Sequence, residues 1–370
     1  MKLTNYLGFT EKDWIELLEE CGAKRFHASQ IMKWIHHRFI KDFSEMSDIG
    51  KEFRDYLVEK GTLLEPKVRA EFVSKDGTRK WLIQSFSGSL FELVYIPEQD
   101  RGTLCVSSQV GCVLDCDFCS TGKQGFSNNL TSAEIVGQIR IAIRKLSEIY
   151  PRRKRNVTNV VFMGMGEPLL NLDNILPALD LIRSDLGYGI SKRKVTVSTA
   201  GIVPAIKSLA ENADVSLAVS LHAPNDELRD QLMPVNKKYP LADLLEACRE
   251  YAKKFSDKRP IFVEYTLLKG INDNFDNAKE LCSILRDLPC KINLIPFNSF
   301  PGSAFKQPSS RRVREFQSIL VEKGYSVTVR TTRGSDIQAA CGQLVGRVSD
   351  RTNRQAKYGE ISLVNEKYFK

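Results

Sequence analysis

The sequence predicts an α/β protein whose largest part is a parallel sheet or partial barrel. Apolar, β-branched stretches of strand length alternate with amphipathic stretches from about residue 101 onward. Strict alternation of this kind is typical of βαβ units, in which neighbouring strands run parallel. Six strands are expected, at Thr103–Gln109, Val157–Met163, Lys194–Thr199, Asp214–Ser220, Ile261–Leu268 and Lys291–Phe297.

Helices are expected between these strands. Thr131 and Glu134 have the spacing of a capping box, which predicts a helix that continues to about Ile149. The other helices are expected over 173–185, 202–211, 241–255, 276–287 and, after the last strand, 309–323. Folds of this class place their chemistry at the carboxyl ends of the strands.

Two smaller regions precede the barrel. Residues 1–65 are predicted to be helical, and their helix over 26–39 mixes aromatic and basic side chains. That mixture is compatible with an RNA-contacting module and equally with a small packed domain. Residues 66–100 are predicted to be rich in strands. The expected organisation is a helical domain at 1–65, a β-rich extension at 66–100, the barrel at 101–331 and a C-terminal segment at 332–370.

Three strands are expected in the β-rich extension. Val68–Val73 and Lys80–Ile83 flank the turn signal Lys75–Gly77, and Leu90–Ile96 follows. Glu92 interrupts the apolar run of this last strand. A solvent-facing glutamate is the ordinary interpretation, and a functional carboxylate is the alternative.

Composition limits the class of protein. The chain has 370 residues, nine cysteines and a net charge of +9. An odd number of cysteines in a chain of this length favours a reducing cytoplasm over a disulfide scaffold. No apolar run reaches about 18 residues, so no membrane-spanning helix is expected. The positive charge suggests an anionic partner, with nucleic acid first.

Basic residues are grouped along the chain. Each group alone is ordinarily a solvated surface, but together they would bind phosphates if the fold gathers them on one side. The groups are 152–155, 192–194, 237–238, 311–314, and Arg347 with Arg351 and Arg354.

The densest chemical signal is a cysteine loop after the first barrel strand. Cys112, Cys116 and Cys119 have C-x3-C-x2-C spacing, which suits an iron–sulfur cluster with one iron left open. A zinc site is the alternative, and Cys105 would be its upstream candidate for a fourth ligand. Four further cysteines, Cys21, Cys248, Cys282 and Cys290, are predicted to be packing residues.

Polar residues end four other strands. Gly164–Pro168 follows the second strand, and Ser198 ends the third. Ser220, Leu221 and His222 end the fourth strand, and Asn298 follows the sixth. Glycines let a ligand approach the backbone, and Glu167 suits an ammonium group. His222 alone would be taken as a hydrogen-bonded loop histidine, but its neighbours favour a binding role.

These motifs resemble those of a known family. The segments Cys105–Cys112, Phe118–Gly122, Gly164–Leu169 and Ala340–Leu344 resemble the RlmN/Cfr family of radical S-adenosylmethionine (SAM) RNA adenine methyltransferases, on the RlmN side. The resemblance extends over nearly the whole chain and is weakest before about residue 90. It implies a partial (β/α)6 radical SAM barrel and a [4Fe–4S] cluster.

The resemblance also implies roles for individual residues. Cys112, Cys116 and Cys119 would bind the cluster. The SAM-binding residues would be Gly166, Glu167, Ser198, Ser220, Leu221, His222 and Asn298. Cys341 would carry the methyl group, Cys105 would resolve the intermediate through a transient disulfide, and Glu92 would accept a proton. Ser335 and Gln338 stand where acidic residues are expected in close relatives, which bears on substrate contacts.

The implied reaction is methylation of adenosine C2 in 23S rRNA and in tRNA next to the anticodon. It would use two molecules of SAM per turnover and an electron donor such as a flavodoxin system. A cytoplasmic monomer without a membrane partner is expected. The alternatives are methylation at adenine C8, as in the Cfr branch, and a non-enzymatic RNA-binding protein with structural zinc.

Overall fold

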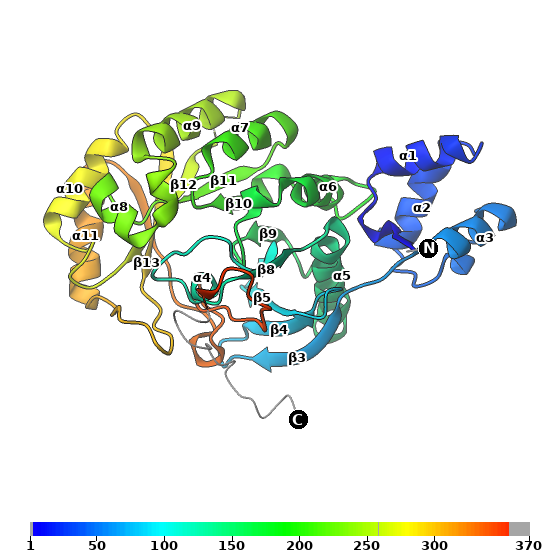
Figure 1. Cartoon of the computed structure of the whole chain (residues 1–370), viewed down its shortest axis with the longest axis horizontal. Coiled ribbons are helices and arrows are strands. Elements are labelled where there is room, and N and C mark those ends of the chain that lie inside the picture. Colours follow the sequence, from blue (N-terminus) through cyan, green and yellow to red (C-terminus); the bar gives the residue numbers. More distant parts are fainter. Residues whose placement is uncertain (1–2, 258, 355–370) are drawn as a thin grey trace.

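A ten-stranded mixed sheet forms the centre of the protein. The structure is a computed structural model that describes residues 3–257 and 259–354. The strand order is β14-β13-β12-β11-β10-β9-β6-β5-β4-β3. The sheet curves, its helices cover the outer face of the parallel half, and helices α1 to α3 stand at one side (Figure 1).

The parallel half of the sheet confirms the predicted α/β barrel. Its strands are β6 (Gly102–Cys105), β9 (Asn159–Phe162), β10 (Val195–Thr199), β11 (Ser216–Ser220), β12 (Ile261–Leu267), β13 (Cys290–Pro296) and β14 (Ser326–Val329). Strand β14 was not expected. It is a short edge strand in which exposed and half-buried residues alternate, so its apolar signal is weak.

Helices connect the strands as predicted, with one addition. They are α5 (Ser132–Ile149), α6 (Leu172–Arg183), α7 (Val203–Asn212), α8 (Asp226–Leu232), α9 (Leu241–Lys254), α10 (Phe275–Ile284) and α11 (Ser310–Glu322). The capping box of Thr131 and Glu134 is present at the start of α5. The short helix α8 was missed. No helix in the described ranges is long and apolar enough to cross a membrane.

The prediction of one continuous strand over Thr103–Gln109 is wrong. Strand β6 ends at Cys105, and β7 (Gln109–Gly111) pairs with β8 (Phe126–Asn129) in a separate two-stranded sheet. Between them the Ser107 N–H donates to the side chain of Gln138 at 2.9 Å, and its hydroxyl donates to the Glu92 carbonyl at 2.6 Å. Because side chains satisfy these backbone groups, the chain leaves the ladder and turns into the cysteine loop.

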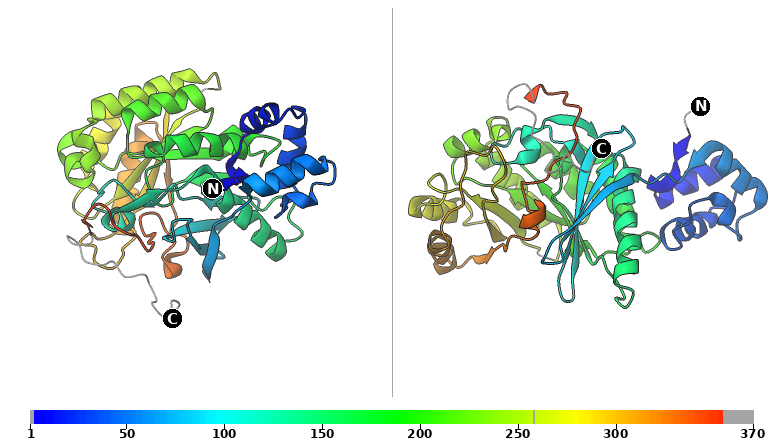
Figure 2. Two further views of the ribbon diagram at one scale, coloured as in Figure 1. Left: turned by 45° about the vertical axis from the view of Figure 1, so that its right-hand side comes forward. Right: turned by 90° about the horizontal axis from the view of Figure 1, so that it is seen from below.

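The β-rich stretch extends the barrel sheet. Strands β3 (Lys67–Val73), β4 (Arg79–Gln84) and β5 (Leu90–Pro97) form an antiparallel meander, and β5 pairs antiparallel with β6. Figure 2 shows this meander beside the barrel, with the C-terminal segment crossing near it. Its position next to β6 brings Glu92 toward the barrel interior.

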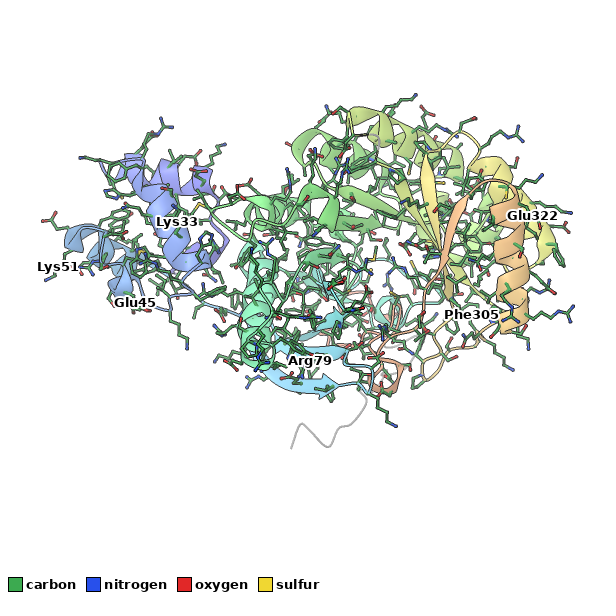
Figure 3. The ribbon with its side chains drawn as sticks, turned by 180° about the vertical axis from the view of Figure 1, so that it is seen from behind. Lys33, Glu45, Lys51, Arg79, Phe305 and Glu322 are labelled. Atoms are coloured by element: carbon green, nitrogen blue, oxygen red, sulfur yellow. The ribbon has the colours of Figure 1, made fainter. Side chains whose placement is uncertain are left out.

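The N-terminal helices pack against the barrel through buried polar contacts. They are α1 (Glu11–Glu20), α2 (His27–His36) and α3 (Lys51–Lys60), with a short pair of strands, β1 (Thr4–Asn5) and β2 (Gly61–Thr62). Arg140 of α5 donates to the carbonyls of Ile35 and Ile40. Figure 3 shows Lys33 and Lys51 at this end of the molecule and Glu322 of α11 at the other.

Two expectations for the N-terminal helices can be compared with the structure. In α2, Ile31 and Ile35 are fully buried and form core. His36 is also buried, with its Nδ1 3.3 Å from the Tyr188 hydroxyl of the barrel. Cys21 was predicted to pack in a core, and this is wrong: it is exposed at the end of α1.

Candidate active site

Two neighbouring cavities open at the carboxyl ends of the parallel strands. The first encloses about 1030 Å³ of unfilled space, including its opening to solvent. Of the predicted site residues it is lined by Cys112, Cys116, Cys119, Gly166, Glu167, Ser198, Ser220, His222, Asn298 and Cys341. The second cavity is lined by Cys105, Arg330 and again by Asn298 and Cys341. The fold therefore brings together residues that are far apart in the sequence.

The cysteine loop forms one wall of the first cavity. It is followed by the short helix α4 (Ser120–Lys123), and the Cys119 N–H donates to the Cys116 carbonyl at 3.1 Å. Burial, followed by the proximity of the other loop cysteines, raises the pKa of both Cys112 and Cys116. A bound cation would reverse this effect, because metal ions bind thiolates. Within the described residues, no three His, Cys, Asp or Glu side chains form a ready site for one metal ion.

The turn after β9 gives the first cavity a buried carboxyl group. Gly166 has φ +97°, and a Cβ there would come within 2.5 Å of the Gln109 Cβ, so this close approach requires glycine. Glu167 accepts backbone N–H groups from Leu169 at 3.0 Å and from Ala200 at 2.7 Å. Burial raises the pKa of Glu167 to about 7, although these hydrogen bonds oppose the shift. The two hydrogen bonds hold the carboxyl group in a fixed position in the lining of the first cavity.

The end of β11 contributes a strained histidine. His222 is buried with φ +58°, and its Nδ1 accepts the Thr266 N–H at 2.9 Å. Burial lowers the pKa of His222 to about 3, and the ring is therefore neutral. Its ring meets Phe118 of the cysteine loop edge-on, with centroids 4.6 Å apart. Leu221 is buried and lies outside the cavity lining.

Arg229, which the sequence analysis missed, fixes the ends of two neighbouring strands. Its guanidinium donates to the carbonyls of Ala200 at 2.6 Å, Ser220 at 3.2 Å and Leu221 at 3.1 Å. The side chain is fully buried in α8. Since α8 itself was not predicted, no signal in the sequence pointed to this arginine.

The C-terminal tail closes over the cavities, and Cys341, Gly342 and Leu344 belong to the lining of the first. Backbone groups of the cysteine loop hold it: the Ser120 N–H donates to the Gly342 carbonyl at 2.9 Å. The Asn298 amide donates to the Cys341 carbonyl at 3.3 Å. In Figure 1 this red segment lies beside α4 and β5. Ser335 begins the short 3₁₀ turn η6 (Ser335–Ile337), and Gln338 ends it. Of the predicted segment 332–370, the part after 354 lies outside the described residues.

Cys105 and Cys341 line the same cavity from elements that are far apart in the sequence. Cys105 ends β6 and is buried, whereas Cys341 is exposed on the tail, and both are free thiols. Burial, followed by the nearby Cys341, raises the pKa of Cys105 to about 12. Cys105 lines the second cavity, whereas the three loop cysteines line the first.

Glu92 is buried, so the ordinary interpretation of a solvent-facing side chain is wrong. Its Oε1 lies 2.8 Å from the Lys80 ammonium, and its Oε2 accepts the Val345 N–H of the tail at 3.0 Å. Burial raises the pKa of Glu92, and Lys80 opposes this rise. Lys80 was not considered from the sequence, although it lies on the predicted strand that comes directly before the strand of Glu92.

A third buried carboxylate, that of Glu264, was not singled out from the sequence. Glu264 on β12 lines the first cavity and accepts from Arg330 and from Asn293, each at 2.8 Å. Burial lowers the pKa of Arg330, but Glu264 more than offsets this and the net shift is upward. Glu264 interrupts an apolar strand as Glu92 does, and that was the available signal.

The fold and the site define the class: this is a radical SAM enzyme. The model of the Radical SAM superfamily matches residues 106–282, and that of the ribosomal RNA large subunit methyltransferase N-terminal domain matches residues 4–63. Membership of the superfamily implies a [4Fe–4S] cluster and SAM.

Comparison with individual proteins narrows the class. The chain is 56% identical over 354 residues to the dual-specificity RNA methyltransferase RlmN of Pseudomonas putida (strain W619), covering 96% of this chain and 93% of that protein. It is 55% identical over 362 residues to RlmN of Pseudomonas fluorescens (strain SBW25), covering 98% and 95%. A crystal structure of a radical SAM methyltransferase from Sphaerobacter thermophilus matches with a TM-score of 0.85 and 40% identity, covering 92% of this chain and 99% of that one. The chain belongs to the RlmN family of radical SAM methyltransferases.

Proposed function

We propose that this protein methylates C2 of adenosine in 23S rRNA, at the peptidyl-transferase centre, and in tRNA, 3′ of the anticodon. The similar Pseudomonas proteins are named dual-specificity RNA methyltransferases. The observation that carries the proposal is the position of Cys341. It lines the cavity of the cysteine loop and also the cavity of Cys105. A thiol in that position can accept a methyl group from SAM bound in the first cavity and transfer it to a base in the second.

The residues of the first cavity suit the implied cofactors. Cys112, Cys116 and Cys119 would hold a [4Fe–4S] cluster and leave one iron for the amino and carboxylate groups of SAM. Glu167 suits the ammonium group, and the close turn at Gly166 admits the ligand to the backbone. Ser198, Ser220, Leu221, His222 and Asn298 are the other proposed SAM-binding residues. When bound, the cluster and two molecules of SAM per turnover supply a methyl group and the one-electron chemistry that an unreactive ring carbon requires.

The protein's own residues divide the remaining work. Adenine C2 lies between two ring nitrogens and is not a nucleophile, so the base cannot attack a methyl donor directly. Cys341 instead takes the methyl group as a thiolate and holds it against the base. The carbon held by Cys341 would then lose one hydrogen atom to the one-electron chemistry that the bound cofactors supply and would bond to C2. Glu92 would remove the C2 proton as the adduct returns one electron to the cofactors. Cys105 would then attack the Cys341 sulfur and break its bond to the carbon, which takes up a proton and leaves as the methyl group of the base, while the two sulfurs remain joined as a transient disulfide.

RNA must deliver an unstacked adenosine to the second cavity. The net charge of +9 favours an RNA backbone, and binding is expected to weaken as salt rises. Several basic groups are already engaged within the protein: Lys192 and Arg193 pair with Asp257, and Arg155 donates to the Tyr188 carbonyl. We propose further that the enzyme is a cytoplasmic monomer reduced by a donor of the flavodoxin type.

The direct test is nucleoside analysis after anaerobic reconstitution. The reconstituted protein is incubated with SAM, a reductant and unmodified rRNA or tRNA, and the RNA is digested. 2-Methyladenosine in both substrates is the expected product. 8-Methyladenosine would favour the Cfr-like alternative. A colourless protein with one bound zinc and no methylation would favour the RNA-binding alternative.

A further inference from the structure

We infer that Arg354 is a positioning residue for the cysteine loop, which it braces from the side opposite the thiols while lending positive charge to the bound cluster. The inference rests on the cluster assigned under the proposed function. It concerns a residue of the C-terminal segment, far from the loop in the sequence.

The side chain of Arg354 is directed at the backbone of this loop. Its Nη1 donates to the carbonyls of Cys112 at 2.9 Å, Leu114 at 2.9 Å and Gly122 at 2.8 Å. Its Nη2 donates to the Val113 carbonyl. One guanidinium therefore contacts four carbonyls that span the loop from its first cysteine to α4. A planar fork with five N–H donors suits such a cluster of acceptors, whereas a lysine has three.

A charge contact completes this brace. The Nε of Arg354 lies 3.8 Å from a carboxylate oxygen of Asp115, which stands between the first two cysteines. The side chain of Arg354 is only 13% exposed, so its charge is weakly screened by water. Its electrostatic effect on the loop is correspondingly greater than that of a surface arginine.

One peptide unit links Arg354 directly to a cluster ligand. The carbonyl of Val113 accepts from Arg354. The N–H of the same peptide, that of Leu114, acts on the sulfur of Cys112 and opposes the rise that burial causes in the pKa of this thiol. Because the peptide is planar and trans, its C=O and N–H point in opposite directions. A cation at the carbonyl both fixes this orientation and polarises the N–H toward the sulfur. Hydrogen bonds to ligating sulfurs are among the factors that set the potential of an iron–sulfur cluster.

The segment that carries Arg354 is anchored beside the loop at a second point. The Arg351 N–H donates to the Phe126 carbonyl at 2.9 Å. A Cβ at Gly125 would come within 1.9 Å of the Asp350 carboxylate, so the Asp350 side chain lies directly against the backbone of residue 125. The tail that bears Cys341 thus continues into a segment, residues 350–354, that contacts the cysteine loop and the strand after it. We call this segment the strap. The same stretch of chain places the methyl-carrying thiol and shapes the radical-generating site.

The test compares two arginines three residues apart. Arg354→Gln removes the fork and the charge, while Arg351→Gln removes the same charge from an exposed side chain of the same strap. Each reconstituted protein is challenged with an iron chelator, and its remaining iron and visible absorbance are followed. The potential for one-electron reduction of the cluster by dithionite is then measured by redox titration with EPR detection.

Arg354→Gln should lose iron faster than the wild type and reduce at a more negative potential. We expect the ratio of reduced to oxidised cluster at the wild-type midpoint to fall about tenfold, which is about 59 mV for a one-electron couple. Arg351→Gln should match the wild type in both measurements. Arg354→Lys keeps the charge but serves fewer carbonyls, so its potential should recover more than its iron retention. This variant also keeps the test valid if Arg354→Gln holds no cluster.

Equal iron loss and equal potential in Arg354→Gln and the wild type would overturn the inference. So would faster iron loss at an unchanged potential, because Arg354 would then be a structural brace alone. Neither readout uses RNA. A protein that methylates no RNA, yet shows this dependence on Arg354, would contradict the proposed function while supporting the inference.

Discussion

The two cavities of the site are built in different ways. Three thiols of the first come from one short loop, Cys112 to Cys119, and its other walls are the ends of parallel strands and a part of the C-terminal tail that includes Cys341. The thiols of the second come from β6 and from the C-terminal tail. Asn298 and Cys341 line both cavities. The difference predicts that the cluster ligands are supplied by one short loop, whereas the proposed group transfer depends on tertiary contacts that bring the tail back to the barrel.

Removal of a loop cysteine should have the largest effect, because it disables the first cavity and everything that depends on it. Cys116→Ala should lower bound iron and abolish both SAM cleavage and RNA methylation, by more than the roughly 100-fold typical of losing an outer-shell partner. Iron analysis and 5′-deoxyadenosine formation measure this. Cys21→Ala is the matched control, since Cys21 is exposed in the N-terminal region. Methylation at the wild-type rate in Cys116→Ala would exclude the cluster assignment.

Cys341→Ala should abolish the group transfer proposed for the second cavity and leave the SAM cleavage proposed for the first. RNA methylation should disappear because the methyl carrier is lost, while iron content and reductive cleavage of SAM should persist because the first cavity keeps its ligands. Chromatography of 5′-deoxyadenosine and of digested RNA gives both values from one reaction. Full RNA methylation by this variant would refute the role of Cys341.

Cys105→Ala should leave the carbon transfer to the base intact and block the next step, the release of the base from Cys341. Without the resolving thiol, the Cys341 sulfur remains bonded to the base, and a protein–RNA adduct should accumulate to a level near that of the enzyme. Denaturing gels and digestion of the adduct measure it. Release of methylated RNA at the normal rate, with no adduct, would remove Cys105 from the mechanism.

Glu92→Gln should slow RNA methylation without affecting the cleavage of SAM in the first cavity, although Glu92 is buried outside the lining of both cavities. Loss of a positioned base typically costs about 10²- to 10⁴-fold in rate. Lys80→Met should have a smaller effect, because it leaves the carboxylate but removes its ion-pair partner at 2.8 Å. Single-turnover methylation kinetics distinguish the two. A rate in Glu92→Gln within about twofold of the wild type would assign the proton to another base.

The smallest expected effect is on the pH dependence of SAM binding in the first cavity. Burial raises the pKa of Glu167 to about 7, so the carboxylate form is lost as pH falls through that value. A neutral carboxyl group accepts an ammonium hydrogen bond less well, and SAM affinity should fall about fivefold from about pH 7 to about pH 6. Calorimetric titration of the reconstituted protein measures this. Glu167→Gln should bind more weakly and with less dependence on pH; the same pH profile in both would attribute the titration to another group.

Much of the first cavity was predictable from the sequence because its determinants are local. Parallel strands place their carboxyl ends at one edge, so Glu167, Ser198, Ser220 and His222 were expected together. The split of Thr103–Gln109 was not predictable, because the Gln138 side chain that replaces the ladder bonds comes from α5. The period and spacing of apolar residues within one segment carry no information about a side chain that a distant helix contributes to it.

The second cavity and the buried Lys80–Glu92 pair, which lies outside its lining, show the same limit more strongly. The Lys80–Glu92 pair depends on strand register, and Arg330 depends on the edge strand β14, whose apolar signal is weak. The resemblance to a family supplied roles for Cys105, Glu92 and Cys341. It supplied none for Arg354 or Arg229, whose hydrogen bonds become apparent only when the chain is folded.

The most direct test of the central claim is to follow one labelled methyl group. The reconstituted protein is treated with SAM that carries a deuterated methyl group, and the tryptic peptide containing Cys341 is analysed by mass spectrometry before and after RNA is added. We expect the label first on Cys341 and then, on turnover, in 2-methyladenosine. Labelled RNA formed while Cys341 never carries the label would contradict the role of this thiol as the methyl carrier between the two cavities.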